Sequence, residues 1–511
     1  MTEPEFWAPE AALRIMTRLE TAGFASYMVG GAVRDEACGR APHDCDLCTA
    51  ALPEQVERLF SDCRVIETGL KHGTVTVLMD GEPFEITTFR TESGYSDGRH
   101  PDAVQFVPSI EADLARRDFT VNAMAWSPVR GLCDPFGGLD DLNCGLLRCV
   151  GEPEQRLTED ALRILRALRF RAERGLRIEP ATDRALRSCC ALLERVSAER
   201  ITAELLRILC GAHAGRVLME YPEIFVKILP ELAPMVGFEQ HNYHHRYDVW
   251  EHSVRALEGI RPEPELRLAM LLHDCGKPVV FFTDEDGVGH FYNHPKVGSE
   301  LAKQTLSRLR LDNRMYDEVL YLVRHHDEPL GVNLKSARRK LAVHGEERFR
   351  KLLAVKKADC IGQGTAPENL AGLLETERLL EQVLEQDACL KIKDLAVNGH
   401  DLMAWGLRGP EIGHCLAELL ERVLDDPSCN TPNRLRELFE SRAANRMELT
   451  VSGMSAKFCE INVCTLLERL DGVSHVQAEL PSGRVTVTGS RLDRARIRDA
   501  LADAGYEVVI G

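Results

Sequence analysis

The segment from Tyr27 to Thr49, YMVGGAVRDEACGRAPHDCDLCT, restricts the fold and chemistry of the chain more than any other. It begins with an apolar run that is typical of a buried strand, and its glycine pair allows a tight turn close to a ligand. Asp44 and Asp46 follow with one residue between them, and residues i and i+2 of a strand point to the same face. We therefore expect the two carboxylates to hold a divalent cation such as Mg²⁺, with Gly31 and Arg34 at the phosphates that accompany it. The alternative is a surface turn whose aspartates are only solvated.

Two motifs in this segment, GGAVRD and HDCDLCTA, resemble the head of the class II nucleotidyltransferase superfamily. Its members are the CCA-adding tRNA nucleotidyltransferases and the bacterial poly(A) polymerases. The resemblance implies Mg²⁺-dependent transfer of nucleotides to an RNA end without a nucleic-acid template.

A third acidic residue, Glu85, lies in the second of two alternating segments, 72–80 and 83–91. These segments predict two antiparallel strands joined by a turn at Asp80-Gly81. Two-metal phosphoryl chemistry commonly uses a third carboxylate, and the resemblance places the third acidic residue of the family here. The alternative is an exposed strand glutamate.

The polar, turn-rich segment 92–102, ESGYSDGRHPD, predicts a mobile loop. In the CCA-adding enzymes that it resembles, the matching loop is needed for the final A and is shortened in relatives that add only CC. The loop is intact here, with Arg99, His100, Pro101 and Asp102 in place, so we expect an enzyme able to add A.

The segment 114–126, LARRDFTVNAMAW, is similar to the second signature of the superfamily, in which an arginine contacts the incoming nucleotide. The resemblance assigns this contact to Arg117, with Asp118 and Asn122 as its structural supports.

The segment 158–175, TEDALRILRALRFRAERG, predicts a single helix with Thr158 as N-cap and Gly175 as C-cap. Arginines recur at every third position, so they form one drifting stripe and several can face the same ligand. A solvated basic helix face is the alternative.

The E-D-x-x-R motif in this helix resembles the protein template of the family, which selects the incoming base. The resemblance implies that Asp160 and Arg163 read C or A, and that Arg166 and Arg169 contact the nucleotide. Aspartate and arginine carry planar hydrogen-bonding groups that suit the edges of bases.

Histidines and aspartates gather on several segments after residue 240, with an His-Asp doublet at the end of an apolar helix. This combination indicates a set of metal ligands and resembles the HD phosphohydrolase superfamily. The resemblance implies four core ligands, which are His252, His273, Asp274 and Asp359. A second metal would use His294 with His325 or His326. A bound divalent metal would activate water against a phosphate ester. The alternative is a degenerate scaffold whose histidines are ordinary core residues.

After residue 446 the pattern predicts strands and helices in the order βαββαβ, a ferredoxin-like sandwich. It resembles the heavy-metal-associated domain, whose metal motif is C-x-x-C. Ala456 stands where the first cysteine belongs and only Cys459 remains, so we expect a structural or interaction module.

Composition and charge argue against some classes of protein. The chain has 511 residues, a net charge of −17 and 17 cysteines without a regular framework. The negative charge argues against long, non-specific coating of nucleic acid, although a confined basic groove is compatible with it. The scattered cysteines and the absence of a long apolar run favour a cytoplasmic protein without a membrane span.

We therefore expect an α+β protein: a nucleotidyltransferase head (1–145), a neck that selects nucleotides and binds RNA (146–235), an all-α HD domain and tRNA-binding body (236–445), and a heavy-metal-associated-like domain (446–511). The expected function is CCA addition to tRNA from CTP and ATP, with Mg²⁺ at the head and another divalent metal at the HD site. The alternatives are a poly(A) polymerase or A-adding enzyme, and a metal-dependent HD phosphohydrolase acting on RNA ends.

Overall fold

The computed structural model describes residues 6–42, 44–94, 102–243, 245–364, 367–386, 388–444, 446–454, 457–480, 482–489 and 492–509. The chain divides into two compact units, one formed by residues 1–328 with 351–373 and the other by residues 329–350 with 374–511. Among the described helices, none combines the length and apolar character needed to cross a bilayer.

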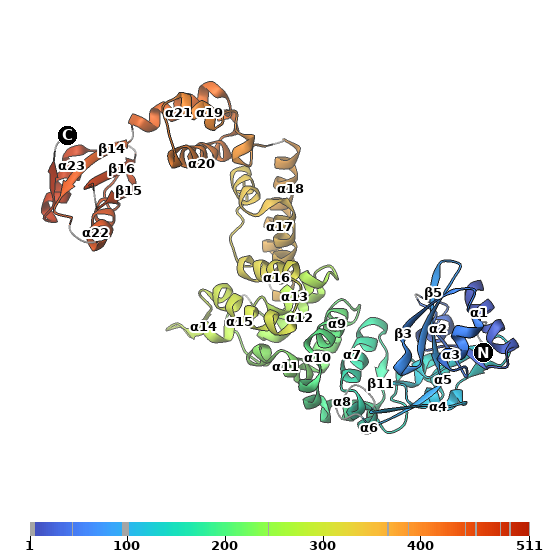
Figure 1. Ribbon diagram of the computed structural model, residues 1–511. Helices are drawn as coiled ribbons and strands as arrows, with labels where there is room; N and C mark the ends of the chain where they lie inside the picture. The colour runs from blue at the N-terminus through green and yellow to red at the C-terminus, as the bar shows by residue number, and fades with distance from the viewer. Residues whose placement is uncertain are drawn as a thin grey trace. The chain divides into compact units, whose positions relative to one another are not determined.

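The head is a seven-stranded sheet with the order β3-β4-β5-β2-β1-β8-β9. The strands are β1 (Ser26–Val29), β2 (Leu47–Thr49), β3 (Arg64–Gly69), β4 (Thr74–Met79), β5 (Glu82–Thr88), β8 (Ala125–Ser127) and β9 (Gly131–Cys133). Every neighbouring pair is antiparallel except β2 and β5, which run parallel. The blue region of Figure 1 shows this sheet with its helices α1 (Glu10–Thr21), α2 (Gly31–Ala37) and α3 (Pro53–Leu59).

The expected hairpin at Asp80-Gly81 is confirmed. β4 and β5 pair from Thr74↔Thr87 to Met79↔Glu82, and the two turn residues have φ of 56° and 87°. Positive φ at both positions is what a two-residue type I′ turn requires, because it matches the twist of the strands.

The remainder of the head consists of short strands and helices. It contains β6 (Arg90–Ser93), β7 (Ala103–Phe106), α4 (Ile110–Ala115) and α5 (Gly138–Asn143). The loop expected at 92–102 joins β6 to β7, but Arg99, His100 and Pro101 lie outside the described residues, so that expectation stays a prediction.

Helices follow the head, and one apolar core continues from Phe119 through the neck to Ala358. They are α6 (Pro153–Glu159), α7 (Leu162–Arg174), α8 (Pro180–Ser188), α9 (Ala198–Leu209), α10 (Ala214–Glu220), α11 (Pro222–Ile228), α12 (Val249–Glu258), α13 (Pro264–Leu272), α14 (Lys277–Val280), α15 (His294–Leu309), α16 (Asn313–His325), α17 (Leu334–Gln363) and α18 (Pro367–Glu385). Two very short strands, β12 (Phe282–Thr283) and β13 (Gly289–His290), form a hairpin between α14 and α15.

The single helix expected at 158–175 is wrong in its N-terminal portion. α6 already begins at Pro153, a residue suited to the first turn of a helix, and Thr158 lies inside α6. The helix breaks at Asp160, which has an extended backbone (φ −145°, ψ 103°), and α7 starts anew at Leu162. The C-cap was predicted correctly: Gly175 has a φ of 71°.

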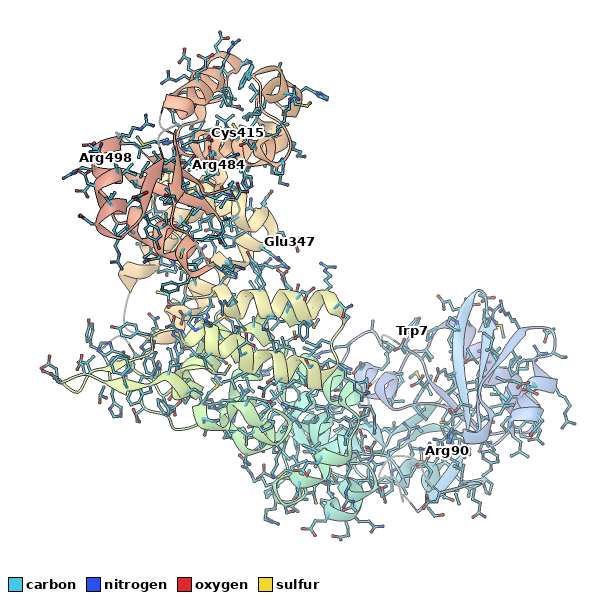
Figure 2. The ribbon with its side chains drawn as sticks, turned by 60° about the vertical axis from the view of Figure 1, so that its left-hand side comes forward. Trp7, Arg90, Glu347, Cys415, Arg484 and Arg498 are labelled. Atoms are coloured by element: carbon cyan, nitrogen blue, oxygen red, sulfur yellow. The ribbon has the colours of Figure 1, made fainter. Side chains whose placement is uncertain are left out.

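The C-terminal residues form a small domain with its own core. Its order is β14 (Arg446–Ser452), α22 (Lys457–Leu467), β15 (Val473–Glu479), β16 (Arg484–Gly489), α23 (Arg494–Asp503) and β17 (Glu507–Val509). The sheet order β15-β16-β14-β17, antiparallel throughout, confirms the ferredoxin-like arrangement. Figure 2 labels Arg484 on the sheet and Arg498 on a helix of this domain. Before it come α19 (Gly399–Ala404), α20 (Pro410–Asp425) and α21 (Pro432–Ala444), which share a separate core.

Candidate active site and metal centre

A pocket of about 840 Å³ brings together the head and the first neck helices. All the residues expected to bind Mg²⁺ or the nucleotide, except Glu85, line it: Gly31, Arg34, Asp44, Asp46, Arg117, Asp160, Arg163, Arg166 and Arg169. A smaller pocket of about 130 Å³ shares Asp46 and Arg117 with it and is also lined by Glu85 and Arg90. Figure 2 labels Arg90 in the head. A wall that carries both carboxylates and arginines suits a metal-bound triphosphate.

The strand register explains how the third carboxylate reaches the other two. Asp46 immediately precedes β2 and Glu85 lies on β5, and the parallel pairing of Leu47 with Ile86 sets these two acids side by side. Asp44 and Asp46 were expected on the strand itself. Both lie before it, because β2 begins only at Leu47.

The charge balance among these acids favours a cation. Surrounding protein atoms, and then the negative charges of Glu85 and Asp44, raise the pKa of Asp46, while Arg117 opposes the shift. Like charges that repel each other in this way are stabilised when a hard divalent cation binds between them, so the three acids fit such an ion.

Gly30 makes room for the arginine that the second signature supplies. It has φ 66° and ψ −122°, and an added Cβ would lie 2.8 Å from Nη1 of Arg117. Arg117 is also 3.4 Å from Oδ2 of the buried Asp113. The expectation that Asp118 and Asn122 support Arg117 is therefore wrong, because Asp113 does so.

Asp118 and Asn122 instead connect two other arginines. Arg34 donates to Oδ1 of Asn122, whose Nδ2 donates to Oδ1 of Asp118 at 2.9 Å. Arg166 donates to Oδ2 of Asp118 from Nε (2.8 Å) and Nη2 (2.6 Å). Burial alone would raise the pKa of Asp118, but the Arg166 charge and these hydrogen bonds hold this pKa well below its ordinary value.

The break between α6 and α7 positions the two residues of the E-D-x-x-R motif. Oδ1 of Asp160 accepts from the Leu162 N–H at 3.1 Å, and Oδ2 accepts from Arg200 at 2.7 Å. Arg163 Nη1 donates to the Arg156 carbonyl and to Glu159, each at 2.7 Å. The chain around the break therefore holds Arg163 at the pocket wall, and it holds Asp160 there together with Arg200 of α9.

A second cluster lies among the HD helices. Ligand atoms of His252, His273, Asp274 and Asp359 converge within 4.8 Å of one another, as expected. The Nε2 atoms of the two histidines are 3.2 Å apart, and His252 Nε2 lies 3.1 Å from Asp274 and 3.0 Å from Asp359. Asp359 was expected to end its helix, but α17 continues beyond it to Gln363.

The chemistry of these donors fits a divalent metal. His273 Nδ1 faces the Met270 carbonyl at 2.7 Å, so Nδ1 carries the proton and Nε2 turns to the carboxylates. Burial opposes its charge, but Asp274 and Asp359 raise the pKa of His273 to about 10 in the metal-free chain. A divalent cation would supply that positive charge and leave Nε2 free to coordinate.

A second ligand group shares Asp274 with the first and contains His294 and His326. Their Nδ1 atoms face the carbonyls of Phe291 (2.9 Å) and Val323 (2.8 Å), and their Nε2 atoms are 3.0 Å apart. His325 turns away, since its Nδ1 binds Glu328 at 2.8 Å. The structure thus brings His326, and not His325, to His294 and Asp274.

Comparison with known proteins agrees with this arrangement. Three family models match: the poly A polymerase head domain at residues 26–148, the probable RNA and SrmB-binding site of polymerase A at 175–236, and the HD domain at 242–361. The CCA-adding enzyme of Lactobacillus helveticus is 33% identical over 435 residues, covering 84% of this chain and 96% of that protein. The chain belongs to the CCA-adding enzyme family.

Other members of the CCA-adding enzyme family match over similar lengths. The enzyme of Lacticaseibacillus paracasei is 33% identical over 442 residues, covering 86% of this chain and 96% of that protein. The crystal structure of the Bacillus stearothermophilus CCA-adding enzyme in complex with CTP is 30% identical with a TM-score of 0.65, covering 86% of this chain and 100% of that chain. The resemblance of the last domain to heavy-metal-associated domains stays a prediction, and Ala456 lies outside the described residues.

Several residues at the two sites of this family member were not found from the sequence. Arg200 and Arg207 of α9 line the pocket, and Arg174 donates to Asp35 at 2.6 Å. α9 lies far from the head motifs along the chain, and each arginine resembles an ordinary surface residue of an amphipathic helix.

At the HD cluster, sequence reasoning missed Lys277. This buried lysine lies 2.7 Å from Asp274, 2.9 Å from Gln240 and 3.1 Å from His245. Burial and then the Lys277 charge lower the pKa of His245 to about 3, so its ring is neutral and accepts the hydrogen bond. The Gly-Lys pair shortly after the His-Asp doublet was the available signal.

Proposed function

We propose that this chain adds CCA to the 3′ end of tRNA, using CTP and ATP without a nucleic-acid template. One observation carries the proposal: the same pocket is lined by the carboxylates Asp44 and Asp46 and by the E-D-x-x-R residues Asp160 and Arg163. A site of this kind can bind the triphosphate and inspect the base at the same time.

The proposed roles follow the geometry. Asp44, Asp46 and Glu85 would hold Mg²⁺, which would supply charge stabilisation while the tRNA 3′-hydroxyl bonds to the α-phosphate of the nucleotide and pyrophosphate leaves. Gly31 and Arg34 bind the triphosphate, and Arg117 stabilises its charge beside the carboxylates.

The proposed selection of CTP and then ATP rests on α7 and on Asp160, which lies in the break between α6 and α7. Asp160 and Arg163 present an acceptor and donors to the edge of the base, and Arg166 and Arg169 complete the arginine wall. Because the protein carries this pattern, the sequence of the product needs no template strand.

Incorporation of labelled CTP and ATP into tRNA that ends before its CCA tests the proposal. We expect ordered addition of C, C and A by the wild type, and none by the Asp44→Ala/Asp46→Ala variant. Incorporation of ATP alone would assign the chain to the A-adding or poly(A)-synthesising enzymes instead.

A second activity is supported by the HD cluster, whose ligand groups at Asp274 fit divalent metal. We propose a phosphohydrolase that removes phosphate from RNA ends, since trimming would prepare an end for extension. Release of phosphate from RNA with a 3′-phosphate or cyclic phosphate, lost in Asp274→Asn, would support it. Retention of that release in the variant would contradict it.

We propose four domains, with boundaries at 1–145, 146–235, 236–445 and 446–511. We also propose a cytoplasmic location. All 17 cysteines lie among the described residues and all are free thiols, which suits a reducing compartment.

A further inference from the structure

An aromatic surface lies on the hairpin between two groups of HD ligands, and the proposed reactions do not use it. It consists of Phe282, His290 and Tyr292, and we call it the aromatic platform. The hairpin is the yellow-green projection beside α14 in Figure 1. Phe282 is 45% exposed and Tyr292 67% exposed.

Strand geometry places the three rings on one face. Phe282 and His290 are direct partners across β12 and β13, and Tyr292 follows His290 by two residues. Their ring centroids are 5.3 Å (Phe282–His290), 5.5 Å (His290–Tyr292) and 5.6 Å (Phe282–Tyr292) apart, and His290 is stacked nearly parallel to both partners, at 27° and 15°. The rings therefore form one contiguous cluster.

The alternate residues face inward and fix the hairpin. Phe281 packs on Phe238 and Phe291, with ring centroids 5.3 and 5.5 Å apart. Gly289 donates to the His241 carbonyl at 2.8 Å, and an added Cβ there would lie 2.2 Å from the Gln240 carbonyl oxygen. The platform is thus held in place by close backbone packing.

The inward face also connects the platform to the HD cluster. The ring of Phe291 lies 5.3 Å from Nζ of Lys277, which contacts Asp274, and the Phe291 carbonyl binds His294. Tyr292 precedes His294 by two residues, a span of at most about 7 Å along the chain.

The charges around the platform restrict what it can bind. The tip of the hairpin carries Asp284, Glu285 and Asp286, and Asp284 binds His290 at 2.7 Å. Three acids repel a triphosphate or a long RNA backbone that crosses the tip, whereas an unpaired base has no charge and stacks well on aromatic rings.

We propose that the aromatic platform binds the unpaired 3′-terminal base of an RNA by stacking and so presents that end to the HD cluster. The proposal goes beyond CCA addition, and it rests on the proposed function only in taking RNA ends as the substrate. A base stacked on the outer face of these rings contributes binding that changes little with salt, because no phosphate contact is involved.

Photocrosslinking tests this with the full-length chain and a short single-stranded RNA that carries 4-thiouridine at its 3′ end. We expect crosslinks in the tryptic peptide 268–296, reduced about tenfold in Phe282→Leu/Tyr292→Leu, because leucine keeps apolar bulk without a ring. Tyr292→Phe should retain the crosslinks. Phe458→Leu, which changes a phenylalanine that is 74% exposed elsewhere, should retain them too.

Three results would overturn the proposal: no crosslink in peptide 268–296, crosslinks that persist in the double leucine variant, or complete competition by cytidine monophosphate at the concentration of the RNA. Equal thermal unfolding midpoints of variant and wild type verify that the variants are folded. The Asp44→Ala/Asp46→Ala variant separates the two proposals, since it should lose nucleotide addition and keep the crosslinks.

Discussion

Asp118 is the residue on which two arginines of the pocket depend. Replacement by asparagine removes the charge that Arg166 needs and puts an NH2 group where an oxygen accepted hydrogen bonds from Arg166 or from Asn122. Breaking a fully buried pair costs about 3–5 kcal/mol. We expect a smaller loss here, because the Arg166 side chain is 34% exposed and water can solvate its charge. We expect Asp118→Asn to lower the midpoint of urea unfolding and to raise KM for CTP. An unchanged midpoint would show that Arg166 finds another partner.

The same residue predicts a dependence on pH. The pKa of Asp118 is lower in the folded chain than in the unfolded chain, so its contribution is full above the ordinary value of about 3.9 and is lost as the pH falls below it. Urea midpoints measured between about pH 5 and about pH 2 should fall more steeply for the wild type than for Asp118→Asn. Parallel curves would contradict this assignment.

Gly30 permits a comparison between backbone strain and a steric clash. Gly30→Ala should cost about 1–2 kcal/mol through its positive φ and should also displace Arg117, whose Nη1 lies 2.8 Å from the new Cβ. Gly23→Ala is a matched control, since Gly23 has a φ of 89° and no atom within 4 Å of an added Cβ. We expect only Gly30→Ala to reduce incorporation of CTP, by more than tenfold. Equal activity of the two variants would argue against a role for Arg117.

At this scale, sequence reasoning succeeded where a residue type determines the chemistry. Asp46 and Glu85 are adjacent because β2 and β5 pair in parallel, and both were predicted from their carboxylates and motif. The partner of Arg117 was not, since the choice between Asp113 and Asp118 depends on where α4 ends relative to the sheet.

At the scale of elements, the break between α6 and α7 predicts separate effects on stability and specificity. Asp160→Ala removes the cap on the Leu162 N–H and should cost about 1 kcal/mol. It should also relax the choice between CTP and UTP, measured as the ratio of their kcat/KM values, if Asp160 reads the base.

Asp312→Ala is the matched control for that change, because Asp312 caps α16 through the Met315 N–H at 3.0 Å, far from the pocket residues in sequence. It should lose similar stability without changing the choice of nucleotide. A shift in specificity in both variants would indicate that the effect of Asp160 is only structural.

The same break shows what sequence patterns miss. The apolar repeat from Leu157 to Leu168 is almost continuous, so periodicity alone predicts one helix. Asp160 leaves the helix because its side chain accepts from the Leu162 N–H and binds Arg200 of α9. Arg200 lies 40 positions further along the chain, so the local sequence pattern does not reveal this contact. The βαββαβ order was predicted correctly because each of its elements has a clear period and a turn of its own.

At the scale of the whole molecule, the two proposed metal sites should be separable. His273→Asn should reduce the metal bound per chain, measured by mass spectrometry after dialysis against Zn²⁺ or Mn²⁺, and should leave CTP incorporation unchanged. His414→Asn, which alters an exposed histidine, should change neither. Loss of CTP incorporation in His273→Asn would show that the head depends on the HD cluster.

The final domain provides another test of modularity. Residues 446–511 have their own core, and the pocket residues all lie between Gly30 and Arg207. We therefore expect a chain that ends at residue 444 to incorporate CTP and ATP at the rate of the full chain. A slower rate would reveal a contribution of this domain to tRNA binding.

Asp274 belongs to both ligand groups of the HD cluster, with Oδ2 near His252 and His273 and Oδ1 near His294 and His326. Two ions that share one carboxylate do not load independently, since the first reduces the electron density that the second receives and also fixes the carboxylate plane for it. A calorimetric titration with metal should therefore resolve two unequal steps, and removal of Asp274 should abolish both together. The occupancy of this centre would then follow cellular metal supply as a graded response, with singly and doubly loaded forms at different concentrations.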